Sequence, residues 1–507
     1  MYALLGLAAL AVLPGCGGDQ PPPKILVIGV DGGTFDLLAP WLEEGRLPVL
    51  AGLVEEGVSG TLYSVLPPLS PPAWTSAVTG VNPGAHGIFD FNRPDPESLQ
   101  PILETASNRR VPALWTLLSE QGRRVGILNV PMSDPPDPVD GYLVAGFPHP
   151  DTVGYTYPPE LEERLRNLGY RLDTMGNLLV PGREWDLRNE FFATFERRRD
   201  AALVLTREHP ELDLNWIVFT GTDRAQHYYW KFMDRDHPFY DAGLAEIHGT
   251  VIRDMWEAVD AAIGELIAIS EVQAAEQGRE LAVIVLSDHG FGGIYRAFRP
   301  QSLLKQPPDG RPPIEHAYCV DTNASLIFVP RPGRETHAPY GRDEHPEVVA
   351  EIRDRILAAR DPETGLCPAL GGWTREEAFT GRYVDRGPDL VFLPRPNTYF
   401  IHEAGDKDPF GRVDFTFNAF HEIDGLIIAR GPMFTKGEIE GNQNLLDVMP
   451  TVMHLAGAVV PGYVEGKVLT SLFSPSFRKA RPVVVDSRSA REVGGDGEVI
   501  RGIPYLN

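Results

Sequence analysis

The sequence predicts an α/β fold with a mostly parallel central sheet flanked by helices and a smaller α/β insertion. Short, continuous apolar runs recur along the chain, as in strands buried on both faces. They lie at 24–30, 125–130, 142–147, 215–221, 281–287 and 425–432. Helical patterns separate them, including an apolar stripe with a period of four: Ile247, Val251, Met255, Val259 and Ile263. Strands that alternate with helices indicate a parallel sheet.

A stretch rich in proline, glycine and charge interrupts this alternation. Inside it lie two apolar runs, 324–329 and 388–393, and a helical pattern with Val348, Ile352 and Ile356. After it the main pattern resumes, with a helix led by Asp447. We therefore expect four parts: a tether of 1–23, a catalytic domain of 24–291 and 402–473, an inserted cap of 292–401 and a peripheral tail of 474–507.

The composition excludes some classes of function. The chain has 507 residues, of which 43% are hydrophobic and 23% charged, so the bulk of it is not disordered. Its formal net charge of −24 argues against nucleic-acid binding, which needs clustered lysine and arginine. If the substrate carries a phosphate, a bound cation would have to offset the repulsion.

The N-terminus has the pattern of an export signal. The apolar run from Tyr2 to Leu13 is too short to span a bilayer and has the length of a signal-peptide core. It leads to Cys16 in a segment that resembles the lipobox of bacterial lipoproteins. We expect an exported, lipid-anchored protein on the outer side of the bacterial cytoplasmic membrane or in the periplasm; the alternative is an apolar terminus with an incidental cysteine. Cys319 and Cys367 could form a disulfide or remain two free thiols.

Ionisable side chains follow three of the predicted strands. Asp31 follows 24–30, Asp223 and His227 follow 215–221, and Asp288 and His289 follow 281–287. In open α/β sheets the carboxyl ends of the strands form the ligand-binding edge. Converging carboxylates repel one another unless a cation lies between them. Mixed aspartate and histidine ligands suit zinc or another divalent transition metal.

These motifs resemble the alkaline phosphatase superfamily, in particular its type I phosphodiesterase and nucleotide pyrophosphatase branch and a group of predicted phosphohydrolases or phosphomutases. The resemblance rests on GVDG, SAVTG, NPGAHG, SDHG and a late histidine before GLIIARGP, and it extends from about residue 24 to 473. It implies two divalent metal ions, with zinc expected and manganese the alternative. One ion would be held by Asp31, Ser70, Asp288 and His289, and the other by Asp223, His227 and His421.

The same resemblance implies that Ser70 is the nucleophile. It stands in PPLSPPAWTSAVTG, which also contains Thr75, Ser76 and Thr79. We expect Pro72 to begin a helix just after Ser70, so that the other three hydroxyls lie along the helix in packing and capping roles. A metal ion can lower the pKa of a serine hydroxyl, and two ions can stabilise the entering and leaving oxygens of a phosphoryl transfer.

Some positions depart from the family pattern. Pro71 replaces an aromatic residue of the nucleotide-cleaving members, and Phe91 replaces their asparagine, with Asn92 one position later. The arginine that sulfatases need is missing. The sequence thus predicts a hydrolase of phosphate mono- or diesters, with a phosphorylated small molecule, lipid or glycan as substrate. The alternatives are a phosphomutase or phosphotransferase and a non-catalytic binding lipoprotein. The oligomeric state stays open.

Overall fold

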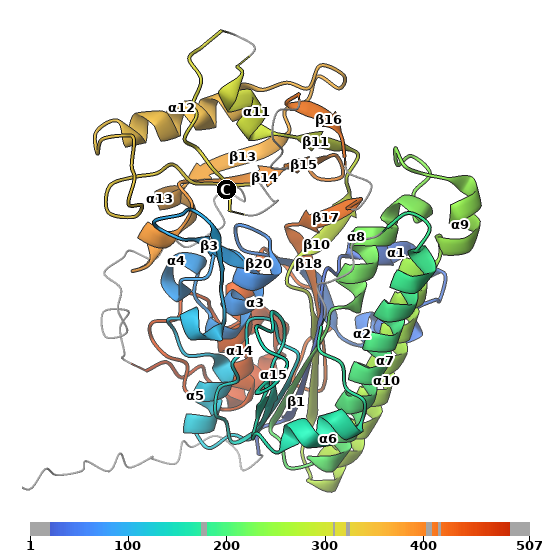
Figure 1. The fold of residues 1–507 in the computed structure, drawn as a ribbon. Helices are drawn as coiled ribbons and strands as arrows, with labels where there is room; N and C mark the ends of the chain where they lie inside the picture. Colours follow the sequence, from blue (N-terminus) through green and yellow to red (C-terminus); the bar gives the residue numbers. More distant parts are fainter. Residues whose placement is uncertain are drawn as a thin grey trace, which may run out of the picture.

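The computed structural model describes residues 21–173, 180–307, 310–320, 325–401, 408–413 and 417–486. In these ranges a large sheet has helices on both faces, and a cap of smaller sheets and helices covers one end (Figure 1). The prediction of a mostly parallel α/β fold is confirmed. Cys16 and the rest of the expected signal lie outside the described residues, as does the tail beyond residue 486.

The central sheet has ten strands in the order β19-β2-β18-β9-β1-β8-β5-β6-β7, with β20 beside β2. Strands β9, β1, β8, β5 and β6 are parallel, and each forms from one of the predicted apolar runs. The run at 425–432 also forms a strand, but β18 is antiparallel to both its neighbours. The strands are β1 (Lys24–Val30), β2 (Val58–Tyr63), β5 (Val125–Leu128), β6 (Gly141–Val144), β7 (Thr156–Tyr157), β8 (Leu214–Phe219), β9 (Leu281–Leu286), β18 (Asp424–Arg430), β19 (Gly437–Glu438) and β20 (Gln443–Asn444).

Helices cover both faces of this sheet. In Figure 1, α2, α7, α8 and α10 lie on one side, and α3, α5 and α14 on the other. The helices of this part are α1 (Phe35–Glu43), α2 (Pro48–Glu56), α3 (Ser70–Thr79), α4 (Pro83–His86), α5 (Leu114–Glu120), α6 (Leu161–Asn167), α7 (Glu184–Glu208), α8 (Gly221–Met233), α9 (Ala242–His248), α10 (Val251–Glu276), α14 (Val448–Leu455) and α15 (Pro475–Ala480).

The predicted apolar stripe forms the buried face of α10, with one exception. Val251, Met255, Val259 and Ile263 are fully buried, whereas Ile247 is 49% exposed. Ile247 lies on α9, which ends at His248 before Gly249. The predicted stripe therefore included residues of two helices, α9 and α10. A rule based on residue spacing alone does not detect the break between them.

The cap has its own small core. Phe298, Ile352 and Phe392 belong to a hydrophobic cluster separate from that of the main sheet. The predicted helix with Ile352 is confirmed as α12. The cap consists of β11 (Arg296–Phe298), α11 (Pro300–Lys305), β12 (Leu326–Ile327), α12 (His345–Ala358), β13 (Ala369–Thr374), α13 (Arg375–Ala378), β14 (Leu390–Pro394), β15 (Tyr399–Ile401) and β16 (Phe410–Arg412). Two further strand pairs are β3 (Asn92–Pro94) with β4 (Pro101–Leu103), and β10 (Gly290–Gly293) with β17 (Ala419–Glu422).

Helix α3 begins earlier than predicted. Ser70 is its first residue, and Pro71 and Pro72 follow in the first turn. The first-turn amides of a helix lack intrahelical partners, so proline is tolerated there without loss of a hydrogen bond. The predicted start at Pro72 is therefore two residues late, and Ser70 belongs to the helix instead of preceding it.

Two remaining observations concern the thiols and the membrane. Cys319 is buried, Cys367 is half-buried, and no disulfide joins the two, so the disulfide alternative is wrong in this structure. Of the helices in the described ranges, none is long and apolar enough to cross a bilayer.

We predict opposite effects for two Gly→Ala substitutions. A Cβ at Gly29 on β1 would lie 2.4 Å from Cη2 of the buried Trp74 and 2.9 Å from Val218 Cγ2, so Gly29→Ala should destabilise the fold by about 1–3 kcal/mol. Gly52 lies inside α2, and a Cβ added there would meet no atom within 4 Å outside its own helix backbone and chain neighbours. Gly52→Ala should therefore stabilise the fold by up to about 1 kcal/mol. Denaturant midpoints of both variants check this; an unchanged midpoint for Gly29→Ala would contradict the tight strand–helix contact.

Candidate metal centre

Three neighbouring strands of the sheet bring the predicted acidic residues together. β1 lies between β9 and β8, and all three are parallel, so their carboxyl ends meet at one edge. Asp31 follows β1, Asp288 follows β9, and Asp223 lies in the first turn of α8 directly after β8. His227 is one helical turn beyond Asp223 and faces the same way.

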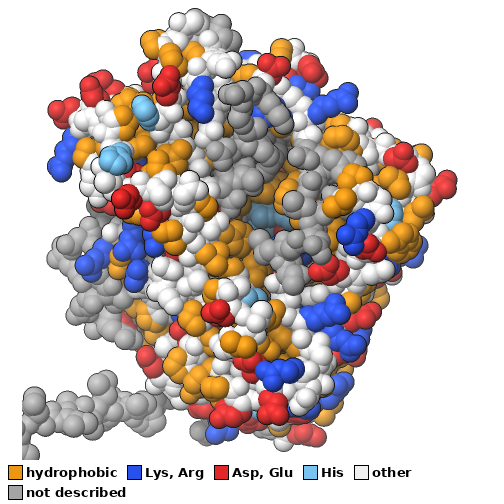
Figure 2. Space-filling view, in the orientation of Figure 1, with side chains coloured by type: hydrophobic (Ala, Val, Ile, Leu, Met, Phe, Trp, Pro, Cys, Tyr) orange, Lys and Arg blue, Asp and Glu red, His pale blue; other side chains and the backbone are white. Residues whose placement is uncertain are grey.

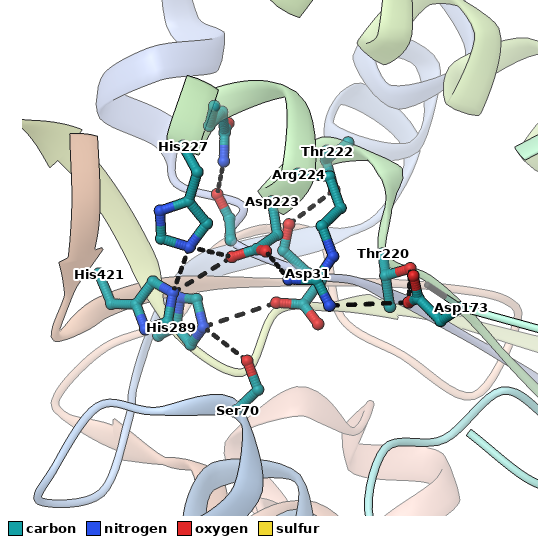
Figure 3. A network of polar contacts seen from close by, with 12 residues as sticks. Asp31, Ser70, Asp173, Thr220, Thr222, Asp223, Arg224, His227, His289 and His421 are labelled. Carbon is teal, nitrogen blue, oxygen red and sulfur yellow. Dashed lines mark hydrogen bonds and ion pairs between the residues drawn. The ribbon is translucent and has the colours of Figure 1, made fainter. Parts of the chain in front are cut away.

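The other two predicted residues arrive from separate elements. His421 lies on β17, opposite Phe291 of β10, and this pairing carries it back to the edge of the sheet. Ser70 is the first residue of α3. Figure 3 shows that all of these side chains except Asp288, which is not labelled there, converge on one place. The structure thus gathers the residues that the sequence analysis selected.

The first cluster consists of Asp31, Asp288 and His289, with Ser70 beside it. One candidate ligand atom from each of Asp31, Asp288 and His289 lies within 4.8 Å of the other two. His289 Nε2 is 3.5 Å from Asp31 Oδ1 and 3.2 Å from Asp288 Oδ2. Ser70 Oγ lies 3.3 Å from the same nitrogen (Figure 3). One ring nitrogen therefore faces three oxygen atoms, all of them buried.

The second cluster consists of Asp223, His227 and His421. Asp223 Oδ1 lies 3.3 Å from His227 Nε2 and 3.2 Å from His421 Nε2. The two ring nitrogens are only 3.0 Å apart. The rings of His289 and His421 stack with centroids 3.8 Å apart, so the two clusters are in direct contact.

The three histidines share one orientation. His227 Nδ1 donates to the carbonyl of Ala419, His289 Nδ1 to that of Gly290, and His421 Nδ1 to that of Pro68, at 2.9, 3.0 and 3.1 Å. A carbonyl can only accept, so each Nδ1 carries the proton and each Nε2 keeps a lone pair. This is the arrangement of metal-binding histidines, whose second nitrogen is oriented by a backbone carbonyl or a carboxylate.

The carboxylates also fit a bound cation. Asp31 Oδ1, Asp223 Oδ1 and Asp288 Oδ2 are buried and have no hydrogen-bond partner. These are the oxygens that face the Nε2 lone pairs, so each cluster presents buried electron pairs to a common point. An unpaired buried carboxylate is costly, whereas a divalent metal ion satisfies it. The residues present therefore fit two metal ions.

The pKa values reflect this crowding. Burial and the neighbouring carboxylates raise the pKa of Asp31 and Asp288 well above their usual range. Burial alone would do the same to Asp223, but the guanidinium of Arg224 beside its Oδ2 acts in the opposite direction and lowers the pKa of this carboxyl. Burial lowers the pKa of His289 and His421, which keeps both imidazoles neutral.

Several supporting residues escaped the sequence analysis. Arg224 Nη1 donates to Asp223 Oδ2 at 3.1 Å, and its Nη2 lies 3.8 Å from Asp173 Oδ2. Thr220 Oγ1 donates to the same Oδ2 of Asp173 at 2.8 Å (Figure 3), and Arg198 Nη1 lies 3.3 Å from it. The only signal in the sequence was the place of Arg224 next to Asp223, because Asp173 and Arg198 lie in other segments.

Three more hydrogen bonds fix the edge of the sheet. Trp74 Nε1 donates to Asp31 Oδ2 at 3.3 Å, which ties α3 to the end of β1. Thr222 Oγ1 donates to the carbonyl of Asp31, and Gln226 Nε2 to that of Gly32, at 2.6 and 2.9 Å. Helix α8 therefore carries ligands of the second cluster and also holds the backbone of the first.

The other hydroxyls of α3 have structural partners. Thr75 and Thr79 donate to the carbonyls four residues earlier, and Ser76 is 3.0 Å from His86 Nε2. Packing roles are thus confirmed; none of them caps the helix, whose N-cap is Leu69. Phe91 stacks on Phe147, 5.8 Å between centroids. Asn92 lies on β3 and lines a cavity with Glu104 and Arg386.

Comparison with solved structures supports the fold. Murine ectonucleotide pyrophosphatase / phosphodiesterase 5 superposes with a TM-score of 0.53 at 17% identity, over 86% of this chain and 95% of that one. An inactive variant of that protein, in complex with AMP, gives 0.53 at 18%. Phosphonoacetate hydrolase from Sinorhizobium meliloti 1021, in complex with phosphonoacetate, gives 0.58 at 16%, over 87% and 97%. Identities this low establish the shared fold alone.

Sequence comparison places the chain in a family. No curated protein matches it. The model of the family "Type I phosphodiesterase / nucleotide pyrophosphatase" matches residues 25–423, which is most of the chain and includes both clusters and Ser70. The chain therefore belongs to the type I phosphodiesterase / nucleotide pyrophosphatase family, a family of phosphoester hydrolases.

Proposed function

We propose that this protein is a metal-dependent phosphohydrolase that cleaves phosphate mono- or diesters through a covalent phosphoserine on Ser70. Asp31, Asp288 and His289, with Ser70, would hold one divalent ion, and Asp223, His227 and His421 would hold the other. Zinc is the metal that the donor set favours, because imidazole nitrogens and single carboxylate oxygens are its common ligands.

One observation carries this proposal: three imidazoles turn Nε2 toward three carboxylate oxygens that lack a donor. Protonation of the imidazoles cannot replace the cations without loss elsewhere. If an Nε2 were protonated in the neutral ring, its Nδ1 could no longer donate to the backbone carbonyl. Protonation of both nitrogens would place a positive charge on a buried ring. Burial disfavours that charge, and it lowers the pKa of both His289 and His421.

The chain's own residues account for the course of the reaction. When bound, two divalent ions would neutralise the carboxylates, favour the alkoxide of Ser70 and take up charge on the entering and leaving oxygens. Ser70 Oγ would form a bond to phosphorus as the bond to the leaving oxygen breaks, and the serine proton would leave with the released alcohol. Water would then attack the phosphoserine, giving its hydroxyl to phosphorus and its proton to Ser70 as phosphate or a phosphate monoester is released. The net reaction consumes one water molecule.

The position of Ser70 suits this role. It starts α3, and the N-terminus of a helix favours an anion. Its hydroxyl donates to His289 Nε2 at 3.3 Å, which directs Oγ toward the first cluster. The prolines on both sides restrict the backbone, so little conformational entropy is lost when the nucleophile is held in place.

The substrate would enter from the cap side. Figure 2 shows a hollow between the cap and the sheet, with histidine side chains visible in it. A cavity of about 350 Å³ empty volume adjoins His421 and is lined by cap residues that include Leu393, Arg395 and Tyr399. The structural relatives bind AMP and phosphonoacetate, so we propose a phosphorylated small molecule, lipid or glycan as the substrate.

The first test removes the nucleophile. Ser70→Ala should lower kcat on aryl phosphate monoesters and diesters by about a thousandfold or more, while the metal content stays at the wild-type level. Thr79→Val, which removes a hydroxyl from the other end of α3, should keep activity. Wild-type turnover by Ser70→Ala would show that another group attacks phosphorus. The ratio of monoester to diester rates identifies the preferred substrate.

The second test removes the metal. Dialysis against a chelator should abolish activity, and zinc should restore it at two equivalents per chain. Asp223→Asn should lower the stoichiometry to one, because the second cluster loses its carboxylate. Manganese replaces zinc in a parallel reconstitution to identify the preferred ion. An active preparation with no bound transition metal, measured by elemental analysis, would refute the two-metal scheme.

A further inference from the structure

The cap contacts the strand pair that carries His421. Strands β10 and β17 pair antiparallel, with Phe291 opposite His421 and Gly292 opposite Phe420. The turn between β14 and β15, residues 395–398, lies against this pair (Figure 1). A residue of the cap is therefore in contact with the residue that follows a candidate metal ligand.

Two hydrogen bonds hold this turn to the strand pair. The backbone N–H of Asn397 donates to Glu422 Oε1 at 2.8 Å, and Gly293 N–H donates to Asn397 Oδ1 at 3.3 Å. The bond from Gly293 ties the turn to β10, and the bond to Glu422 ties it to β17. We refer to Asn397, Gly293 and Glu422 as the latch.

The geometry of the latch constrains the backbone on both sides. Asn397 has φ of +48°, in the left-handed region that asparagine tolerates better than most residues. A Cβ at Gly292 would lie 2.1 Å from Glu422 Oε1 and 2.8 Å from Asn397 Oδ1. There is no room for a side chain at position 292, so glycine permits the close approach of the turn.

His421 is then held from two directions. Its Nδ1 donates to the carbonyl of Pro68, two residues before Ser70, and so fixes the ring to the main domain. The next residue, Glu422, is fixed to the cap by the latch. Ring orientation and strand position are thus set by separate parts of the fold.

We propose that Asn397 is a positioning residue: through the latch, the cap sets the position of β17 and hence of His421 Nε2 in the second cluster. This rests on the proposed function insofar as the second cluster binds a metal ion. The first cluster has no ligand on β17; its His289 directly precedes β10 and stacks on His421, so we expect the latch to affect this cluster less than the second. Docking of the cap and metal binding at the second cluster are therefore coupled.

The coupling works in both directions. If the latch strengthens metal binding at the second cluster by some factor, metal binding must strengthen the latch by the same factor. Replacing a residue that hydrogen-bonds to a metal ligand typically lowers metal affinity by about 10–100-fold. Asn397 contacts the neighbour of His421 and not His421 itself, so we expect the lower end, about tenfold. The same factor should appear in the amide exchange of the latch.

The experiment uses the full-length chain and zinc. Asn397→Gly keeps the left-handed backbone but removes Oδ1, and Gly292→Ala drives the turn away from β10. Both should weaken zinc binding at the second cluster, the equivalent that Asp223→Asn removes, about tenfold and weaken the other equivalent less, measured by competition with a chromophoric chelator. In the wild type, zinc should slow hydrogen exchange of the Asn397 and Gly293 amides by about the same factor.

Leu99→Gly is the matched control, because Leu99 also has positive φ, at +60°, in the turn between β3 and β4. It should leave both zinc affinities unchanged. The latch proposal would be overturned if Asn397→Gly and Gly292→Ala left both zinc affinities unchanged, or if they weakened zinc binding equally at both clusters. The proposed function would not be affected by either result. A wild-type chain that binds no zinc would overturn the proposed function, and the coupling with it.

Discussion

The mutual repulsion of three buried carboxylates governs the architecture of this protein. Asp31, Asp223 and Asp288 lie at the ends of adjacent strands, where water cannot screen them. Two unit charges 4 Å apart interact by about 4 kcal/mol at the effective dielectric of a protein surface, and burial adds a desolvation cost. Such a set is stable only with protons or cations among its members. The Nε2 lone pairs beside these oxygens supply the nitrogen ligands that a cation needs, and the raised pKa of Asp31 and Asp288 means that protons compete with a cation for the carboxylates.

Most of the surrounding structure keeps this charge cluster in place. Trp74 ties α3 to Asp31, and its ring packs against Gly29 on the same strand. Arg224 takes the second oxygen of Asp223, so that only Oδ1 faces the histidines. Asp173 in turn binds Arg224 and Arg198. The network therefore holds the ligand carboxylate in one orientation and offsets the charge of the guanidinium groups.

The sequence predicted the parts of this site that local rules control. Asp31, Asp223 and Asp288 follow buried apolar strands, and strand ends in parallel sheets converge, so their meeting followed from pattern alone. His421 required the family resemblance, because its position depends on the pairing of β10 with β17, which no spacing reveals. Arg198 and Asp173 were missed because they lie in other segments of the chain and meet Arg224 only in the folded structure. The break between α9 and α10 and the direction of β18 were missed because tertiary contacts decide them.

The net charge of the chain also bears on how an anionic substrate is bound. Arg224 contacts a ligand carboxylate, but Asp173 shares its guanidinium, so it adds little net positive charge. A phosphate ester that approaches a chain of net charge −24 needs a stronger attraction than this. In the proposed scheme, two divalent ions would bring four positive charges against the three carboxylates of the clusters, which would leave an excess for the substrate. The ions that relieve the repulsion within the fold would then also be the charges that attract the phosphate.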